Sequence, residues 1–305
     1  MKHFFFPCAA AMLLAVTFGC RSAAPVCETV TPERIGVCSW SFAEPLAEVA
    51  RDMEAMDVRG IQLAVGPFIA ADGRHGEAET AEAWQQVKAR QASGRWNIMS
   101  TMIAFPQEDY TTLESIRKTG GIVPNACWPK NKAIFAKAVE LSAELKVKYL
   151  SCHAGFLDLN DTGAYKTFCE RLTWMRDTCA KAGIMLLLES GQETADHLVR
   201  LMKAVPGIGI NFDPANMILY GKGRPMEAMV TLMPWIRQIH VKDAVETKVP
   251  GTWGTEVPWG EGEAGGRAFV AKMHALGYTG NFVIEREGGN RRAEDIALAA
   301  RRLKK

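Results

Sequence analysis

Eight short apolar runs, separated by stretches of helical periodicity, limit this chain to few folds. The runs lie at residues 34–40, 59–65, 96–105, 147–155, 183–190, 207–213, 235–243 and 280–287. They are continuous rather than alternating in polarity, which is the pattern of parallel strands buried on both faces of a sheet. Parallel neighbours need a crossover of about a dozen residues or more, usually a helix, and most of the intervening stretches are long enough to supply one.

The stretches between the runs predict helices. Residues 131–147 carry an apolar stripe, residues 161–183 end on a glycine typical of helix C-termini, and residues 294–305 close the chain as a further helix. Eight strands with interleaved helices fit a (β/α)8 barrel, whose usual size is about 250 residues. We therefore expect an α/β protein with a single (β/α)8 TIM barrel domain at 30–305. A doubly wound sheet is the alternative, but no GxGxxG turn follows the first run.

The first residues have the pattern of an export leader rather than of the fold. Lys2 and His3 precede an apolar run at 4–18, which is shorter than the about 20 residues of a membrane span. The run ends in TFGC, which resembles a bacterial lipoprotein processing site with Cys20 as the lipidated residue; cleavage near residues 22–25 is the alternative. We expect a signal peptide or lipoprotein leader at 1–24. The protein would then be exported to the periplasm or anchored to the membrane, and a lipid on Cys20 would be its only contact with the membrane.

The composition argues against some partners. Lys and Arg total 36 against 34 Asp and Glu, for a net charge of +2, so we expect no nucleic-acid partner. Of the eight cysteines, Cys38 and Cys152 fall inside apolar runs, and no pair has the CxxC spacing of a metal site. We expect mostly free thiols, which behave as small apolar side chains when buried. The sequence permits a homo-oligomer without specifying one.

The last four apolar runs each carry a metal-binding type of residue at or near the carboxyl end. These residues are Glu189, Asp213, His240 and Glu285. In a barrel, the carboxyl ends of all strands meet at one rim, so we expect the four side chains to lie together. Any one of them alone would more often be a helix cap, a salt-bridge partner or a core histidine. Three carboxylates and one histidine suit a single divalent ion such as Mn²⁺, Mg²⁺, Co²⁺ or Zn²⁺.

Several motifs resemble those of the sugar phosphate isomerase/epimerase superfamily, whose members are xylose isomerase-like TIM barrels. The matching segments are LLLES, NFDPANM, IHVKD, GEG and GYTGNFVIERE, the last ending at Glu287. The resemblance covers essentially all of the mature chain and is strongest from residue 186 onward. It implies one divalent ion bound by Glu189, Asp213, His240 and Glu285, with the two glutamates also acting as the acid/base pair.

The same barrel also serves abasic-site endonucleases, which hold three zinc ions. In that comparison Asn216 stands where those enzymes have a histidine, and the approach to GEG lacks their Asp-x-His, although His153 is retained. Most ligands for extra zinc ions are therefore missing. The small net charge also gives no basic surface for phosphates, so the sequence argues against a nuclease.

The expected chemistry is that of a metal-dependent sugar isomerase or epimerase. A metal ion next to a ketose carbonyl acidifies the neighbouring C–H; one glutamate removes the proton and the other returns it. A lyase or hydratase that acts on 3-keto sugars or glycosides would begin with the same step. A non-catalytic sugar-binding lipoprotein is a further alternative, although no expected ligand is missing.

Five other residues are candidates for binding the substrate: His153, Asn216, Lys242, Arg286 and Trp253. Trp253 lies in a long connection, 244–266, and a second long connection lies at 106–129. Long loops that follow barrel strands are usually part of the active face. If the leader is functional, we expect a free sugar, an oxidised sugar or a glycoside rather than a phosphate ester.

Overall fold

The computed structural model describes Met1 and residues 28–69, 77–156 and 159–305. The leader expected at 1–24, with Cys20, lies outside this part apart from Met1. Within the described residues, no helix is both long and apolar enough to cross a membrane. The described cysteines (Cys38, Cys127, Cys152, Cys169 and Cys179) are free thiols.

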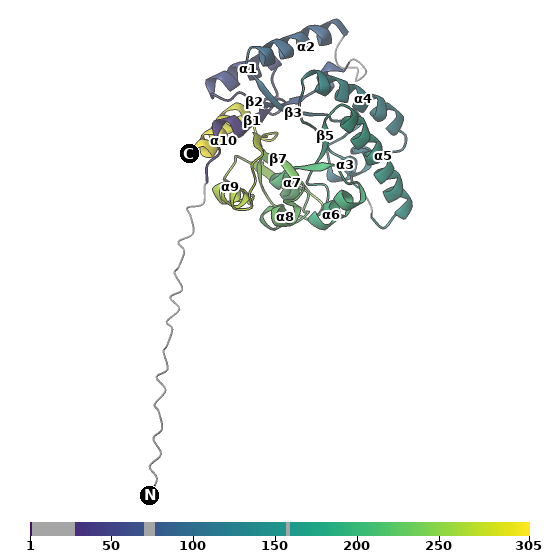
Figure 1. The fold of residues 1–305 in the computed structure, drawn as a ribbon, viewed down its shortest axis with the longest axis vertical. Helices are drawn as coiled ribbons and strands as arrows, with labels where there is room; N and C mark the ends of the chain where they lie inside the picture. Colours follow the sequence, from purple (N-terminus) through teal and green to yellow (C-terminus); the bar gives the residue numbers. More distant parts are fainter. Residues whose placement is uncertain (2–27, 70–76, 157–158) are drawn as a thin grey trace.

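Eight parallel strands close into a barrel, as predicted (Figure 1). They are β1 (Ile35–Cys38), β2 (Gly60–Ala64), β3 (Asn97–Met102), β4 (Tyr149–Cys152), β5 (Met185–Glu189), β6 (Gly209–Phe212), β7 (Ile236–Val241) and β10 (Asn281–Ile284). The order around the barrel is β1-β10-β7-β6-β5-β4-β3-β2, and β1 pairs with both β10 and β2 to close it. Each strand lies within the apolar run that predicted it.

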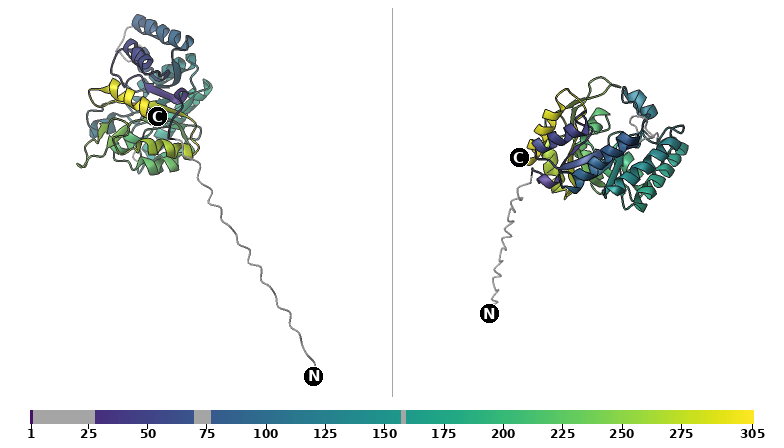
Figure 2. Two further views of the ribbon diagram at one scale, coloured as in Figure 1. Left: turned by 90° about the vertical axis from the view of Figure 1, so that its left-hand side faces the viewer. Right: turned by 90° about the horizontal axis from the view of Figure 1, so that it is seen from above.

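Helices form the outer layer around the strands (Figures 1 and 2). They are α1 (Leu46–Ala55), α2 (Glu77–Ala92), α3 (Leu113–Thr119), α4 (Trp128–Glu144), α5 (Thr162–Lys181), α6 (Ala195–Ala204), α7 (Pro214–Leu219), α8 (Pro225–Leu232), α9 (Gly266–Ala275) and α10 (Arg292–Lys304), with short 3₁₀ turns at Pro32–Arg34 and Gly66–Phe68. The start of α5 follows from its sequence, because the Asp161 side chain accepts a hydrogen bond from Ala164 N. Val30 N donates to Leu303 O and so ties the start of the barrel domain to α10.

The core lies between the strands and the helix layer. The apolar stripe predicted on α4 is buried there: Ile134, Ala138, Leu141 and Leu145 are each at most 5% exposed. Burial of an isoleucine or leucine side chain contributes about 1.5–3 kcal/mol, so the amphipathic pattern fixes which helix face meets the barrel.

The connection after β7 contains more structure than predicted. Two short strands, β8 (Asp243–Val245) and β9 (Thr255–Val257), pair antiparallel. We call residues 243–266 the β8–β9 strap. The buried carboxylate of Asp243 accepts backbone hydrogen bonds from Ala244, Gly260, Gly262 and Ala264 and so fixes the base of the strap. A side chain at Gly262 would collide with this carboxylate, because a Cβ there would lie 2.4 Å from Asp243 Oδ1.

Candidate metal centre and substrate pocket

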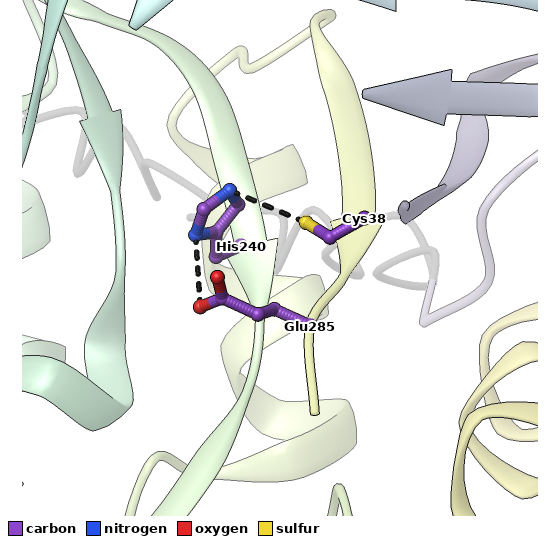
Figure 3. Close-up of side chains that lie close together, drawn as sticks. All are labelled: Cys38, His240 and Glu285. Carbon is purple, nitrogen blue, oxygen red and sulfur yellow. Dashed lines mark hydrogen bonds and ion pairs between the residues drawn. The ribbon is translucent and has the colours of Figure 1, made fainter. Parts of the chain in front are cut away.

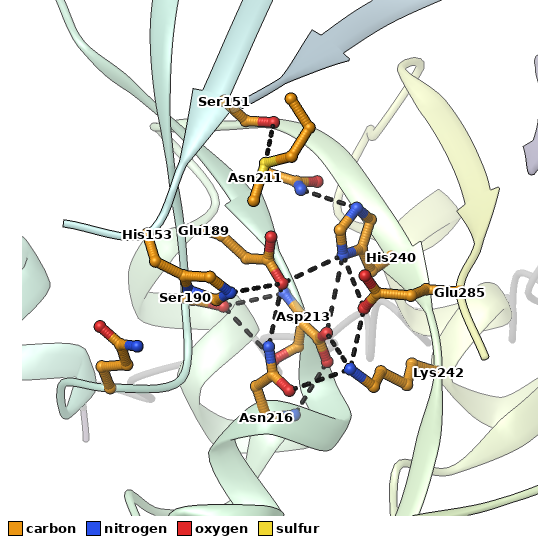
Figure 4. A network of polar contacts seen from close by, with 12 residues as sticks. Ser151, His153, Glu189, Ser190, Asn211, Asp213, Asn216, His240, Lys242 and Glu285 are labelled. Carbon is orange, nitrogen blue, oxygen red and sulfur yellow. Dashed lines mark hydrogen bonds and ion pairs between the residues drawn. The ribbon is translucent and has the colours of Figure 1, made fainter. Parts of the chain in front are cut away.

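The four predicted ligand residues meet at one point of the rim (Figure 4). Glu189 ends β5, Asp213 follows β6, His240 lies within β7 and Glu285 follows β10. These strands are consecutive around the barrel. All four side chains are buried, and one nitrogen or oxygen of each lies within 4.8 Å of the others. We call these residues the quartet.

The centre of the quartet is formed by His240 Nδ1. It lies 3.3 Å from Glu189 Oε1, 3.6 Å from Asp213 Oδ2 and 3.2 Å from Glu285 Oε2. Among the described residues, His240 Nδ1, Glu189 Oε2 and Asp213 Oδ2 are buried without a hydrogen-bond partner. Buried polar atoms are rarely left unpaired, so these atoms need a partner of another kind. A divalent cation fits, since the site offers carboxylate oxygens and an imidazole nitrogen.

The other ring nitrogen of His240, Nε2, contacts a layer of polar side chains inside the barrel. Nε2 lies 2.7 Å from Gln62 Oε1 and 2.8 Å from Asn211 Nδ2. The tautomer protonated at Nε2 would donate to Gln62 and leave the lone pair of Nδ1 facing the carboxylates, as a metal ligand requires. Gln62 is in turn bonded to Ser151, and Gln238 donates to Asn211. The sequence analysis missed this layer, whose only signal is single polar residues inside apolar runs.

Cys38 offers a second group of possible ligands with His240 and Glu285. Its thiol lies 3.6 Å from His240 Nε2, whereas Glu285 faces Nδ1, so the two contacts lie on opposite sides of the ring (Figure 3). Burial raises the pKa of the Cys38 thiol to about 12, which keeps it protonated. The quartet is therefore the better metal site.

Lys242 neutralises part of the negative charge. Its ammonium nitrogen lies 2.9 Å from Glu285 Oε2, 2.6 Å from Glu287 Oε2 and 3.2 Å from Asn216 Oδ1. Burial alone would lower the pKa of Lys242, but Glu285 and Glu287 raise it well above its usual range. Burial alone would raise the pKa of Glu285, but His240 and Lys242 hold it well below its usual range. Lys242 is thus an ammonium and Glu285 a carboxylate.

The remaining quartet members also have fixed neighbours. Asn216 Nδ2 donates to Glu189 Oε1 at 2.9 Å, and His153 Nε2 lies 3.5 Å from the same oxygen. Burial raises the pKa of Asp213 to about 6. One ammonium and one divalent ion would together balance the three quartet carboxylates, which supports the fit of the site to such an ion.

A pocket of about 710 Å³ opens above the quartet. Its polar residues include Glu189, Glu285, Glu287, Lys242, Asn216 and His153, and its walls include Trp40, Met102, Tyr110, Leu219, Tyr220 and Trp253. Trp40 Nε1 donates to Glu285 Oε1 at 2.8 Å, so this tryptophan fixes a quartet member as well as lining the pocket. The pocket therefore joins a charged inner end to a largely apolar wall.

Of the predicted substrate-binding residues, Arg286 does not line this pocket. Its guanidinium donates to Glu256 Oε1 at 2.8 Å and to Asp295 Oδ2 at 3.0 Å. Glu256 belongs to β9 and also accepts the backbone N–H groups of Glu287 and Gly288. Arg286 thus joins the β8–β9 strap to α10, while His153, Asn216, Lys242 and Trp253 do line the pocket.

Known proteins resemble this chain in sequence and in architecture. A 27% identical stretch of 164 residues matches the Escherichia coli (strain K12) protein named "Putative L-ribulose-5-phosphate 3-epimerase SgbU", over 50% of this chain and 57% of that protein. The crystal structure of a xylose isomerase domain protein from Planctomyces limnophilus superposes with a TM-score of 0.77 at 28% identity, over 88% of this chain and 94% of that one.

A third likeness is to a structure solved with a metal ion. The xylose isomerase-like TIM barrel protein from Mycobacterium smegmatis in complex with magnesium has a TM-score of 0.64 at 17% identity, over 89% of this chain and 96% of that chain. At this identity the likeness concerns the fold alone. The model of the xylose isomerase-like TIM barrel family matches residues 51–305, most of the sequence. The chain therefore belongs to the xylose isomerase-like TIM barrel family.

Proposed function

We propose that the protein is a divalent-metal-dependent sugar isomerase or epimerase that moves a proton at a carbon next to a ketose carbonyl. The observation that carries the proposal is the quartet: four buried side chains from consecutive strands, with His240 Nδ1 facing three carboxylates. Sequence similarity to the E. coli protein named as a putative epimerase supports the same reaction class.

Glu189, Asp213, His240 and Glu285 would hold the ion. A bound divalent ion polarises a carbonyl and so acidifies the neighbouring C–H. Glu189 and Glu285 supply the acid/base pair, one removing the proton and the other returning it. They come from β5 and β10, with β6 and β7 between them, so they can approach a sugar from two sides.

The surroundings of the two glutamates suit these roles. Trp40 and Lys242 hold the oxygens of Glu285, whereas Oε2 of Glu189 has no hydrogen-bond partner among the described residues. Asn216 orients Glu189 through its other oxygen. Both glutamates line the pocket, so a bound sugar can reach their carboxyl groups.

The test is proton exchange with a defined metal. Protein stripped with a chelator and reloaded with Mg²⁺ or Mn²⁺ should bind one ion per chain by metal analysis. A panel of free ketoses and 3-keto glycosides in D₂O should then acquire deuterium at one carbon beside the carbonyl, followed by NMR. The stripped protein should give only the background rate, and Glu170→Gln, on the exposed face of α5, is the matched control that should keep full activity.

Three results would overturn the proposal. An absence of exchange across the panel with one ion bound would favour a binding protein. Loss of a substituent with formation of an unsaturated ketone would favour the lyase or hydratase. A stoichiometry near three ions, with cleavage of abasic DNA, would identify a nuclease.

A further inference from the structure

The pocket differs at its two ends, and this difference bears on the substrate. We propose that the substrate is an uncharged keto sugar that carries a flat apolar substituent, as an aryl glycoside does, and is not a sugar phosphate. This inference rests on the proposed function, because it places the reacting ketone at the quartet. Its basis is the charge, the occupied backbone amides and the walls of the pocket.

The pocket has no cation to spare for a phosphate among the described residues. Of those that line it, only His153 and Lys242 can be positively charged. The ammonium of Lys242 is already bonded to Asn216, Glu285 and Glu287. His153 faces Glu189 at 3.5 Å. Four carboxylates also line the pocket, belonging to Glu189, Glu256, Glu285 and Glu287, so the lining gives a phosphate dianion no surplus of positive charge.

The backbone amides that could replace a cation are also occupied. TIM barrels frequently bind phosphate with the loops that follow the seventh and eighth strands, which here are β7 and β10. After β7, the amides of Gly260, Gly262 and Ala264 donate to the Asp243 carboxylate. After β10, the amides of Glu287 and Gly288 donate to Glu256. Carboxylates of the chain itself thus occupy these five amides.

A partly buried cation outside the pocket, Lys222, does not change this. Lys222 lies 5.6 Å from the ring centroid of Phe156, which packs on Tyr220, and it does not line the pocket. Its ammonium group lies over the Phe156 ring rather than among the residues that line the pocket.

The outer part of the pocket is built for an apolar ring. Tyr220 and Trp253 meet at 4.9 Å between ring centroids, and Leu219 and Tyr110 extend the wall. A hexose has about 12 non-hydrogen atoms and so displaces at most roughly 360 Å³ of water, if each atom replaces a whole water molecule. The pocket, at about 710 Å³, has room for a second group of similar size. Few polar side chains line the wall, which favours an aryl group over a second sugar with several hydroxyls.

A glycosidic bond has a chemical consequence for the ketone. It blocks the anomeric carbon, so the carbonyl must be on another ring carbon. Such a ketone forms when a secondary ring alcohol loses two electrons and two protons to an acceptor. The reaction class that supplies the substrate would therefore be the dehydrogenation of a glycoside.

The experiment uses compounds that differ in one group. The full chain loaded with Mg²⁺ is given the 3-ketone of methyl glucoside, of phenyl glucoside and of methyl glucoside 6-phosphate. Deuterium exchange gives kcat/KM for each. Calorimetry with the unoxidised methyl glucoside, phenyl glucoside and methyl glucoside 6-phosphate measures binding without the reaction.

We expect phenyl to exceed methyl by about tenfold or more in kcat/KM and in affinity, and the phosphate to fall below methyl. Trp253→Ala should reduce the phenyl-to-methyl ratio about three- to tenfold. Tyr165→Ala is the aromatic control, because this α5 side chain contacts Arg200 and does not line the pocket, and it should leave the ratio unchanged. A phosphate ester that equals or exceeds methyl would overturn the inference, as would equal rates for phenyl and methyl.

The two proposals can fail separately. Exchange with every ketone but no preference for phenyl would reject the substrate class and keep the reaction. Tight binding of phenyl glucoside with no exchange from any ketone would keep the substrate class and reject the reaction. Trp253→Ala can be checked for folding by circular dichroism before the ratios are compared.

Discussion

The rim of the barrel divides into two arcs that share one geometry and differ in chemistry. The charged arc follows β5, β6, β7 and β10 and provides Glu189, Asp213, His240 and Glu285. The apolar arc follows β1, β2, β3 and β4, where Trp40, Ala64, Met102 and His153 line the pocket. Both arcs end at the same rim, so the fold alone does not determine where the chemistry lies.

The separation follows from strand spacing. Adjacent strands lie about 4.8 Å apart, so side chains from consecutive strands can converge on one point. Two residues of the apolar arc contact quartet members. Trp40 donates a hydrogen bond to Glu285, and Gln62 lies within hydrogen-bond distance of His240 Nε2. We therefore expect substitutions to have the largest effect at ligands of the charged arc and the smallest effect at apolar residues of the apolar arc, such as Met102.

The largest effect should come from the two glutamates. Glu285→Gln and Glu189→Gln keep the size of the side chain and one oxygen but remove the base. General acid/base groups contribute about 10²–10⁴-fold in rate, so the deuterium exchange rate should fall by that order. If one variant exchanges at the wild-type rate, that glutamate is only a ligand. If both do so, the two-glutamate mechanism is wrong.

The next effect compares a direct ligand with its neighbour in the other arc. His240→Ala removes the nitrogen at the centre of the quartet, whereas Gln62→Leu removes the acceptor facing Nε2 and the donor to Ser151 but no quartet atom. Outer partners typically contribute about 10–100-fold in metal affinity, so Gln62→Leu should lie in that range and His240→Ala beyond it. Titration calorimetry with Mn²⁺ measures both. Equal losses would mean that Nδ1 does not bind the ion.

Sequence reasoning reached the charged arc because its signal is local. A hydrophobic strand that ends on a carboxylate is visible in one segment, as at Phe212 and Asp213, and the barrel brings such ends together. The strands were found for the same reason. Burial on both faces makes each run continuous, whatever its neighbours are.

The contacts that the sequence did not predict depend on partners distant along the chain. In the sequence, Gln238 is a single polar residue in an apolar strand and indicates no role. Its role appears only in the structure, where it forms hydrogen bonds with Ser100 and Asn211. The strands of the β8–β9 strap are three residues long, too short for a periodicity. Arg286 follows Glu285 and was expected in the site, but successive side chains point in different directions, and its charge is met by Glu256 and Asp295.

Arg286 gives the third prediction, which concerns the strap that closes one side of the pocket. Arg286→Met leaves Glu256 and Asp295 without their cation, and breaking a buried ion pair costs about 3–5 kcal/mol. We expect a lower midpoint of thermal unfolding and, because Trp253 is on the same strap, a rise in KM of about tenfold. The fall in kcat should be smaller, since no quartet atom is removed. A fall in kcat with unchanged KM would contradict a positioning role.

The smallest effect should come from the wall of the apolar arc. Met102 ends β3, lines the pocket and accepts a weak hydrogen bond from Ser151 Oγ at 3.1 Å through its sulfur. Met102→Leu conserves volume, and swaps of this kind usually cost less than about 1.5 kcal/mol. Ser151 keeps the carbonyl oxygen of Thr101 as an acceptor.

The exchange rate of Met102→Leu should therefore stay within about threefold of wild type, and its affinity for Mn²⁺ should not change, because the sulfur faces no atom of the quartet. Deuterium exchange in D₂O measures the rate, and calorimetry measures the affinity for Mn²⁺, on the same preparation of protein. A loss of metal affinity as large as that of Gln62→Leu would mean that the β3 wall positions the quartet. Residues of both arcs would then determine metal affinity, and the expected ranking, with smaller effects in the apolar arc than in the charged arc, would be wrong.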